Sequence, residues 1–380
     1  MPLVDVLTPQ YWSSLTLAQL FKRSTMLQLV NRDYDSTIAE RGDTINLKRP
    51  GLASMQDAGG VFNSVEMPAE KVSVVLDKWR ETVPWSIDDK TISLAQNSPE
   101  ELIRIAIIPQ AEAIVAELEA AITARYVDFY TAIGAPGTTP ADVAALVSSP
   151  RKRFDDSNIP SAGRRVVLNT AASAKYIEQF WKANETGSTD TQIEGALGRK
   201  GGADYYDSTY LGTHTQGGWS TAPLVNNGPG YAAGVKQMNV DALGSGTLNL
   251  GDIFRINHGG AIGVREYVLT ISSTITTNAA TINFEPGLAA SVADNAAITV
   301  VASHAINLGL HRDAITLVSR PLAQPIIESA KGNVSVQEYM GIGIRTTIWN
   351  EPKDSKTYVK SDLLYGVKTL DARMGFRIMG

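Results

Sequence analysis

The stretch NLGLHRDAITLVSRPL, Asn307–Leu322, decides how this sequence is interpreted, because it carries both a catalytic-looking triplet and a strand pattern. His-Arg-Asp opens the catalytic loop of protein kinases, in which an Asn five residues after the Asp holds a metal ion. Here the residue five after Asp313 is Val318, and the sequence contains neither Gly-x-Gly-x-x-Gly nor Asp-Phe-Gly. The kinase interpretation therefore fails.

The residues after the triplet predict a buried strand. Apolar and small side chains occupy both parities, with Ala314, Thr316 and Val318 alternating with Ile315, Leu317 and Ser319. A strand that is apolar on both faces is typical of a covered sheet. Arg320-Pro321 should end it, because Pro cannot donate to a ladder. We therefore expect this stretch to be structural.

Composition limits the classes of function. The chain has 380 residues, of which 43% are hydrophobic and 19% charged, so it can hold two or three folded domains. Its net charge of −5 argues against a general nucleic-acid binder. The absence of Cys excludes disulfides, a thiolate nucleophile and Cys-ligated metals. No secretory leader or membrane span is recognised, so a soluble protein without membrane contacts is expected.

A long antiparallel hairpin is predicted near the N-terminus. GDTINLKRP, Gly42–Pro50, gives one strand, and EKVSVVLDKWRETVPWSIDD, Glu70–Asp89, a longer one. Such a pair cannot bury a core of its own. The loop between them suggests a partner surface, with a mobile surface loop as the open alternative. Its candidate contact residues are Gly59, Gly60, Val61 and Phe62.

A long amphipathic helix follows. Ser98-Pro99-Glu100-Glu101 is a capping box, and Pro109 kinks or restarts the helix. The apolar positions with helical spacing are Ala111, Ile114, Val115, Leu118 and Ile122, and the glutamates Glu112, Glu117 and Glu119 lie mainly on the other side. A catalytic carboxylate group is the disfavoured alternative, because Glu is common on helix surfaces.

The middle of the chain changes from α/β to all-β character. GRRVVLN, Gly163–Asn169, predicts a short buried strand, followed by a helix capped by Thr170. Between Val225 and Ala302 only 8 residues are charged, about half the density of the whole chain. Alternation in YVLTISSTI and a hairpin through Asn278 predict a small all-β module inserted into the α/β chain.

No active site is recognised. The four histidines, His214, His258, His304 and His311, form no metal-binding motif with nearby carboxylates. GALGRKGG, Gly195–Gly202, lacks the Gly-Lys-Ser/Thr of a phosphate loop. We predict no catalytic, cofactor-binding or metal-binding residue, no cofactor and no enzymatic activity.

The order of these pieces resembles the major capsid proteins of tailed phages, which have the Hong Kong ninety-seven fold. The resemblance is greatest to the P-twenty-two-type coat proteins, which carry an insertion domain. It covers nearly the whole chain. The stretches that carry it are GDTINLKRP with EKVSVVLDKW, PQAEAIVAELEAAI, NIPSAGRRVVLN, EGALGRKGGADYYDS, NLGLHRDAITLVSRPL and DLLYGVKTLDARMGFRI.

The resemblance implies an α+β fold with named domains. Residues 1–41 would be the N-arm and 42–89 the extended hairpin loop. Residues 90–133 and 323–380 would form the peripheral domain with its spine helix, and 134–224 and 303–322 the axial domain. Residues 225–302 would be the inserted β domain.

The resemblance also implies a function. The chain would self-assemble as pentamers and hexamers into the icosahedral head shell around the double-stranded DNA of a tailed bacteriophage. It would be located in the virion, after assembly in the host cytoplasm. Its partners would be copies of itself, a scaffolding protein, a portal and a cement protein, with non-specific contact to the packaged DNA. The alternatives are an encapsulin-like bacterial compartment shell and a glycan- or surface-binding virion module; an unrecognised hydrolase is a further one.

The hairpin loop provides a test. We expect Gly51–Pro68 to be cleaved by protease in free subunits and to be protected in assembled shells, because the Gly-Gly tip beside Val61 and Phe62 should become buried on a neighbour. Limited proteolysis with mapping of the cut sites measures this. Equal cleavage rates in the two states would contradict it.

Overall fold

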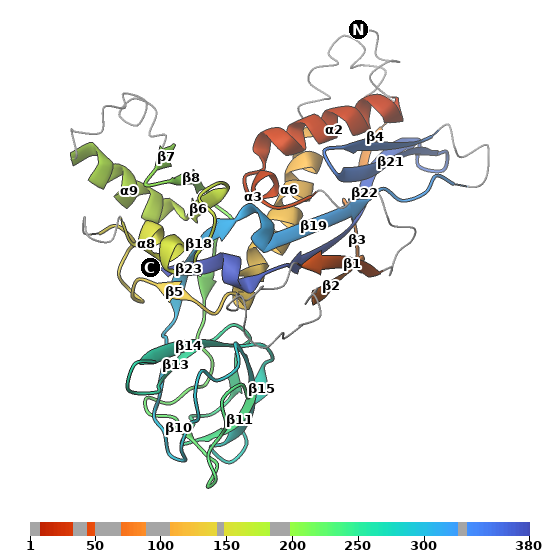
Figure 1. Cartoon of the computed structure of the whole chain (residues 1–380). Coiled ribbons are helices and arrows are strands. Elements are labelled where there is room, and N and C mark those ends of the chain that lie inside the picture. The colour runs from red at the N-terminus through yellow and green to blue at the C-terminus, as the bar shows by residue number, and fades with distance from the viewer. Residues whose placement is uncertain are drawn as a thin grey trace, which may run out of the picture. The chain divides into compact units, whose positions relative to one another are not determined.

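The structure is a computed structural model that describes residues 8–32, 44–49, 70–88, 107–142, 148–182, 198–325 and 333–380. The chain forms two compact units (Figure 1). Unit 1 consists of Met1–Ile122 and Ile315–Leu370, and unit 2 of Thr123–Ala314 and Asp371–Gly380. Each unit is therefore built from segments that are distant in the sequence.

Unit 1 is organised around one antiparallel sheet of strand order β19-β22-β21-β20. The strands are β19 (Ile315–Arg320), β20 (Val334–Tyr339), β21 (Ile342–Glu351) and β22 (Lys356–Thr369). β22 is long enough to pair with further strands along its length, and β3 (Lys78–Glu81) and β4 (Trp85–Asp88) both pair with it.

The predicted hairpin is confirmed in part. β1 (Thr44–Arg49) pairs antiparallel with β2 (Glu70–Val75), with Thr44 opposite Val75. The prediction of one continuous strand over Glu70–Asp89 is wrong, because β3 and β4 leave the hairpin to pair with β22. The hairpin tip with Gly59, Gly60, Val61 and Phe62 lies outside the described residues.

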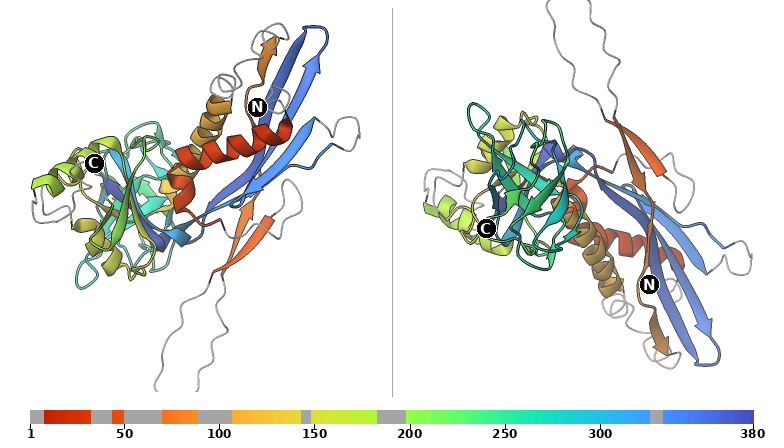
Figure 2. Two further views of the ribbon diagram at one scale, coloured as in Figure 1. Left: turned by 90° about the horizontal axis from the view of Figure 1, so that it is seen from above. Right: turned by 90° about the horizontal axis from the view of Figure 1, so that it is seen from below.

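Residues 8–32 of the N-terminal segment are mostly helical. Helix α2 (Pro9–Arg23) packs on β20 and β21 (Figure 2), and it buries Trp12, Leu17 and Leu20. The short helix α3 (Met26–Leu29) follows. An aromatic and aliphatic face at helical spacing explains why this segment belongs to the core of unit 1.

Helix α6 (Ile108–Thr123) confirms the predicted long helix from Ile108 onward. Its five apolar positions are all buried: Ala111, Ile114, Val115, Leu118 and Ile122. The capping box at 98–101 lies outside the described residues. Glu119 was expected on the exposed side of the helix and is instead fully buried. Its carboxylate accepts the backbone N–H of Thr25 at 2.7 Å, at the residue directly before α3. Burial raises the pKa of Glu119, and the backbone hydrogen bonds oppose that rise.

The stretch Asn307–Leu322 connects the two units. β18 (His304–His311) belongs to unit 2, the short 3-10 helix η4 (Arg312–Ala314) follows, and β19 belongs to unit 1. The predicted strand is confirmed: Ile315 to Ser319 are buried, and the strand ends at Arg320, directly before Pro321. His311 Nε2 lies 2.8 Å from the carbonyl of Ala162. Within this triplet, His311 therefore ends β18, and Arg312 and Asp313 lie in the 3-10 helix between the two strands.

Unit 2 contains a mixed sheet of strand order β5-β23-β18-β6-β8-β7. Its members are β5 (Ala132–Ile133), β6 (Arg164–Leu168), β7 (Arg199–Lys200), β8 (Ala203–Asp207), β18 and β23 (Gly375–Met379), and β9 (Thr213–His214) also pairs with β18. Gly309 in β18 leaves room for the ring of Phe376, since a Cβ at this position would lie 2.3 Å from Phe376 Cζ.

Helices α8 (Ser149–Asp156) and α9 (Thr170–Lys182) accompany this sheet. The predicted strand Gly163–Asn169 is confirmed as β6. The predicted cap of α9 is wrong by one residue: Asn169 Oδ1, not Thr170, accepts the backbone N–H of Ala172 at 2.8 Å. Asn169 therefore occupies the N-cap position and Thr170 the first helical position.

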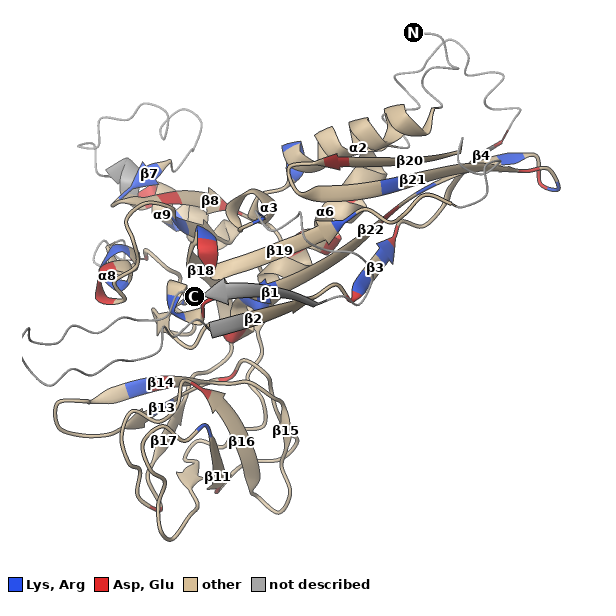
Figure 3. Ribbon diagram, turned by 45° about the vertical axis from the view of Figure 1, so that its right-hand side comes forward, with Lys and Arg blue, Asp and Glu red and all other residues tan. Residues whose placement is uncertain are grey.

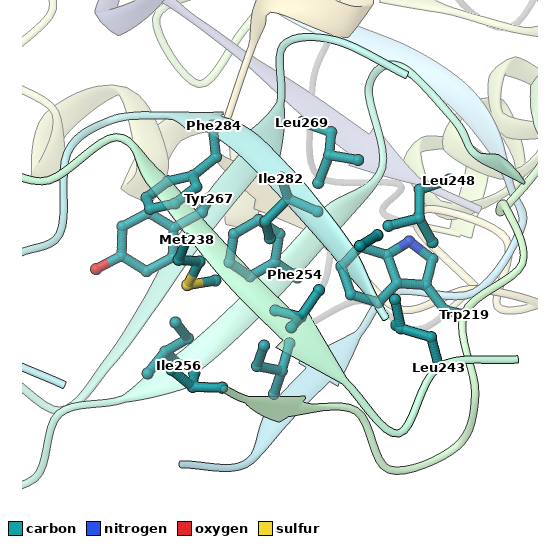
Figure 4. Packing of buried hydrophobic residues seen from close by; sticks show 14 of the residues in the cluster. Trp219, Met238, Leu243, Leu248, Phe254, Ile256, Tyr267, Leu269, Ile282 and Phe284 are labelled. Carbon is teal, nitrogen blue, oxygen red and sulfur yellow. The ribbon is translucent and has the colours of Figure 1, made fainter. Parts of the chain in front are cut away.

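A six-stranded antiparallel sheet of order β10-β11-β16-β14-β13-β17 lies in the low-charge part of unit 2. It comprises β10 (Leu224–Val225), β11 (Gln237–Asp241), β13 (Ile253–Asn257), β14 (Val264–Leu269), β16 (Ala280–Glu285) and β17 (Ile298–Val300), beside the pair β12 (Thr247–Leu248) and β15 (Ser273–Thr274). Its own aromatic core includes Trp219, Phe254, Tyr267 and Phe284 (Figure 4). The predicted hairpin through Asn278 is confirmed, with Thr277 and Asn278 both at positive φ.

Strand pairing decides to which unit each of the closing strands belongs. β19 lies in unit 1 because it pairs with β22, and β23 lies in unit 2 because it pairs with β18. The 3-10 helix η5 (Ala372–Met374) accordingly lies between β22 and β23.

The cap of α9 allows a paired test. We expect Asn169→Ala to lower the free energy of unfolding by about 1 kcal/mol, because the N–H of Ala172 loses its acceptor. Thr170→Ala is the matched control and should change it by less than about 0.5 kcal/mol. Urea unfolding followed by circular dichroism measures both. A larger decrease in the free energy of unfolding for Thr170→Ala than for Asn169→Ala would indicate that Thr170 is the N-cap.

Candidate functional site

The densest group of buried polar side chains that suggests chemistry lies in unit 2. It consists of Tyr126, His214, Trp219, Asp252 and Arg377, and we call it the Asp252 cluster. Tyr126 comes from the 3-10 helix η3 (Ala124–Asp128), His214 from β9 and Arg377 from β23, and Asp252 directly precedes β13. Trp219 lies five residues after His214 in the chain, so four separate segments meet here.

Asp252 is the acceptor at the centre of the cluster. Its side chain is completely buried, and its carboxylate accepts hydrogen bonds from Trp219 Nε1 at 2.9 Å, Asn249 N at 2.9 Å and Gly217 N at 3.2 Å. His214 Nε2 lies 2.9 Å from its other oxygen. A buried carboxylate with four donors has its desolvation offset by charge-assisted hydrogen bonds.

His214 connects Asp252 to Tyr126. Because a carboxylate only accepts, Nε2 of His214 carries a proton, and Nδ1 lies 2.9 Å from the Tyr126 hydroxyl. Burial raises the pKa of Tyr126, so this hydroxyl keeps its proton at neutral pH. The ring of His304 lies beside His214, and burial lowers the pKa of His304 to about 4.

Arg377 closes the cluster from the C-terminal strand. Its side chain is completely buried, and it donates to the carbonyls of Gly251 at 2.7 Å, Tyr126 at 2.9 Å and Val127 at 3.1 Å. The guanidinium also lies over the Tyr126 ring, 5.0 Å from its centroid. Burial lowers the pKa of Arg377 to about 10, which leaves it cationic at neutral pH.

A Tyr-His-Asp arrangement is capable of moving protons, but this one has no access to a substrate. His214 is 3% exposed and Asp252 0%. General acid–base catalysis needs the reacting group within hydrogen-bond reach of the catalytic side chain. The described cleft of about 680 Å³ in unit 2 is lined by other residues. The Asp252 cluster is therefore a structural junction.

Sequence motifs did not reveal this cluster, because the carboxylates close to His214 in the sequence are not its partners. Asp252 lies 38 residues away. The sequence feature that could have indicated the cluster is Asp252 itself, a charged residue directly before an apolar stretch in a region with few charges. Among the described residues, no group of three or more His, Asp or Glu side chains is arranged to hold a metal ion.

Exposed apolar side chains mark a second candidate site, in unit 1. Val75, Trp79 and Val83 are 44%, 43% and 88% exposed, and all three lie on or between strands β2, β3 and β4. Clustered exposed apolar residues are typical of protein–protein contact surfaces. The adjacent β1–β2 pair is a two-stranded sheet, which is marginal on its own and exposes backbone edges.

In unit 2 the exposed apolar residues include Val264 and Ile271, at 57% and 58%. The strand β14 ends at Leu269, and Ile271 lies beyond it. None of the described helices has the length and hydropathy to cross a membrane.

Comparison with known proteins rests on structure alone, because no family model and no curated protein matches this chain. A chain of the solved structure "Mycobacterium phage Che8" is similar over 94% of this chain and 91% of its own length, with a TM-score of 0.50 and 15% identity. That likeness shows the fold, so the α+β, Hong Kong ninety-seven-like fold predicted from the sequence is confirmed.

Two further structures are more distant. "Capsid structure of the Cyanophage P-SCSP1u" gives a TM-score of 0.48 at 11% identity, covering 91% of this chain and 85% of that one. "Crystal structure of virus-like particle from Pyrococcus furiosus" gives 0.41 at 7% identity, covering 97% of both. At these scores neither structure carries an argument.

The role of the Asp252 cluster in stability can be tested by replacing one carboxylate oxygen with an amide nitrogen. We expect Asp252→Asn to lower the free energy of unfolding by about 3 kcal/mol. The new NH₂ group is itself a donor and would face the N–H groups that now donate to the carboxylate. The substitution also removes the buried negative charge near Arg377. Glu285→Gln is the control, since Glu285 forms only an exposed pair with Lys236 and should cost less than about 1 kcal/mol. Urea denaturation of the purified chain measures both; similar losses would argue against a special role of Asp252.

Proposed function

We propose that this chain is the major capsid protein of a tailed bacteriophage. It would self-assemble into the icosahedral head shell that encloses the double-stranded DNA genome, and it would reside in the virion. The observation that carries the proposal is the fold shared with a phage chain over 94% of the sequence. Because a fold does not fix a function, residues of this chain must also support the assignment.

Two features of the described residues support a structural role. The acid–base side chains of the Asp252 cluster are buried and used in folding. The apolar side chains Val75, Trp79 and Val83 are exposed in the isolated chain. This distribution suits a subunit that becomes buried in an assembly and performs no chemistry.

We assign domains on the same basis. Unit 1 corresponds to the peripheral domain, with α6 as the spine helix and β1–β2 as the base of the extended hairpin loop, 42–89. The mixed sheet of unit 2 corresponds to the axial domain. β19 then joins the peripheral domain and β23 the axial domain, since their strand partners lie there.

The β module fits a P-twenty-two-type insertion domain. Its sheet and its aromatic core of Trp219, Phe254, Tyr267 and Phe284 come from residues in and next to 225–302. A core of this size supports an independently packed module. The further partners that we propose follow from this assignment: a separate scaffolding protein, a portal, a cement protein, and packaged DNA through non-specific contacts.

Electron microscopy of the purified chain tests the function. Closed shells are expected, and co-purification with a portal and nucleic acid would distinguish a phage head from a bacterial compartment. Folded monomers that never associate, with or without a scaffolding protein, would contradict the proposal. Monomers that bind glycans would instead favour a surface-binding module.

The exposed segment of unit 1 gives a residue-level test. We expect Val83→Asp to reduce the yield of shells by about tenfold or more, because burying a carboxylate at an apolar contact is costly. Its unfolding midpoint should not change, since Val83 is 88% exposed in the isolated chain. Val83→Ala is the matched control and should assemble normally. Shell yield is measured by sedimentation and microscopy; full assembly of Val83→Asp would exclude Val83 from the contacts.

A further inference from the structure

A cleft of about 680 Å³ in unit 2 has an unusual charge pattern. Four arginines contribute to its lining, Arg153 from α8, Arg255 from β13, Arg265 from β14 and Arg373 from η5. The lining includes only two carboxylates, Asp156 and Glu266. The cleft is thus locally basic in a chain whose net charge is −5, and its volume is typical of a ligand site.

Two of the arginines are neutralised within the protein. Arg255 donates to Glu266 Oε1 at 2.9 and 3.1 Å, and Glu266 Oε2 accepts the backbone N–H of Ala132 at 3.0 Å. Arg373 forms a pair with Asp371 at 2.8 Å, and this carboxylate is almost fully buried. These pairs hold the walls of the cleft in place.

The other two arginines have no such partner. Within the described part of the chain, neither Arg153 nor Arg265 has a carboxylate at ion-pair distance, and Arg153 Nε has no hydrogen-bond acceptor. The nearby Asp156 is paired with Lys152 at 3.7 Å. Figure 3 shows basic residues on both α8 and β14. Two cations on separate elements therefore line one cleft without a direct ion pair among the described residues.

We propose that this cleft binds an acidic polypeptide segment of a partner protein. Carboxylates of the segment pair with Arg153 and Arg265, because the planar guanidinium matches a carboxylate with two parallel hydrogen bonds. Apolar side chains of the segment pack on the non-polar parts of the lining, among them Val264 and Pro286.

The lining favours a peptide over a nucleic acid. Asp156 and Glu266 would repel a continuous row of phosphates, whereas a peptide can place uncharged side chains beside these carboxylates. A nucleic-acid surface is also expected to be basic throughout. The inference goes beyond the proposed capsid function, because the chemistry of the cleft requires no shell.

Binding of a labelled peptide to the full chain tests this. The probe is a short fluorescein-labelled peptide of alternating Glu and Leu, followed by fluorescence anisotropy, with a Gln–Leu peptide as the uncharged comparison. We expect saturable binding of the Glu–Leu peptide only, and a loss of affinity of about tenfold or more in Arg153→Ala/Arg265→Ala. Binding should also weaken as salt is raised.

Arg151→Ala is the matched control. Arg151 lies on the same helix α8, is exposed, and pairs with Asp155 at 3.9 Å outside the cleft lining. It should bind the Glu–Leu peptide as the unmodified chain does. Circular dichroism checks that all variants keep the fold, which is expected because Arg153 and Arg265 make no ion pair within the described residues.

Other results would overturn the proposal. Unchanged peptide binding in the double variant would show that the cleft is not the site. Tighter binding of a duplex oligonucleotide, lost on the same two substitutions, would assign the cleft to nucleic acid. Self-association of the unmodified chain that disappears in the double variant, measured by sedimentation, would assign it to a second copy. Shell formation is measured in a separate experiment, so a negative result in the peptide-binding test does not contradict the capsid proposal.

Discussion

Unit 2 depends on the burial of one guanidinium, that of Arg377. A fully buried Arg is stable only when its donors are satisfied, since an uncompensated buried charge costs several kcal/mol. Arg377 meets this requirement with the carbonyls of Tyr126, Val127 and Gly251. The C-terminal strand, the turn at η3 and the loop before β13 must therefore assemble together. Gly251 is required there, because a Cβ would lie 2.8 Å from Val127 Cγ1.

The same junction explains how the β module is attached. Inside the module the contacts are aromatic and aliphatic, whereas at its base the Asp252 carboxylate accepts from Trp219 and lies in hydrogen-bond contact with His214. Apolar contacts tolerate small shifts, but buried hydrogen bonds are directional and lose their energy when misaligned. At this base Ile253 and Val268 of the module also pack with Ala132 and Met379, and the directional polar contacts add specificity to that apolar packing.

Sequence patterns predicted the elements whose signal is local. The alternation in β19, the apolar face of α6 and the turn at Asn278 are all periodic or conformational features of short segments. The predictions that were wrong concern features that depend on contacts distant in the sequence or on a choice between two neighbouring residues. Asn169 and Thr170 are both good N-cap residues, so propensity alone does not choose between them. The break between β2 and β3 arises from pairing with β22, where Glu81 lies opposite Asp362, far along the chain. Glu119 is buried because an N-terminal helix begins above it, which helical periodicity does not record.

The buried acid–base group and the exposed apolar side chains of the described residues serve different ends. The Tyr-His-Asp group is enclosed and committed to folding. Association needs apolar surface on a firm support. Trp79 lies in β3 and Val83 between β3 and β4, two strands held by the ladder to β22, so their exposed side chains are presented from a rigid sheet. Such a surface can bind without first ordering a loop, and the entropy cost of assembly falls accordingly. This is the physical reason to interpret the fold as a building block.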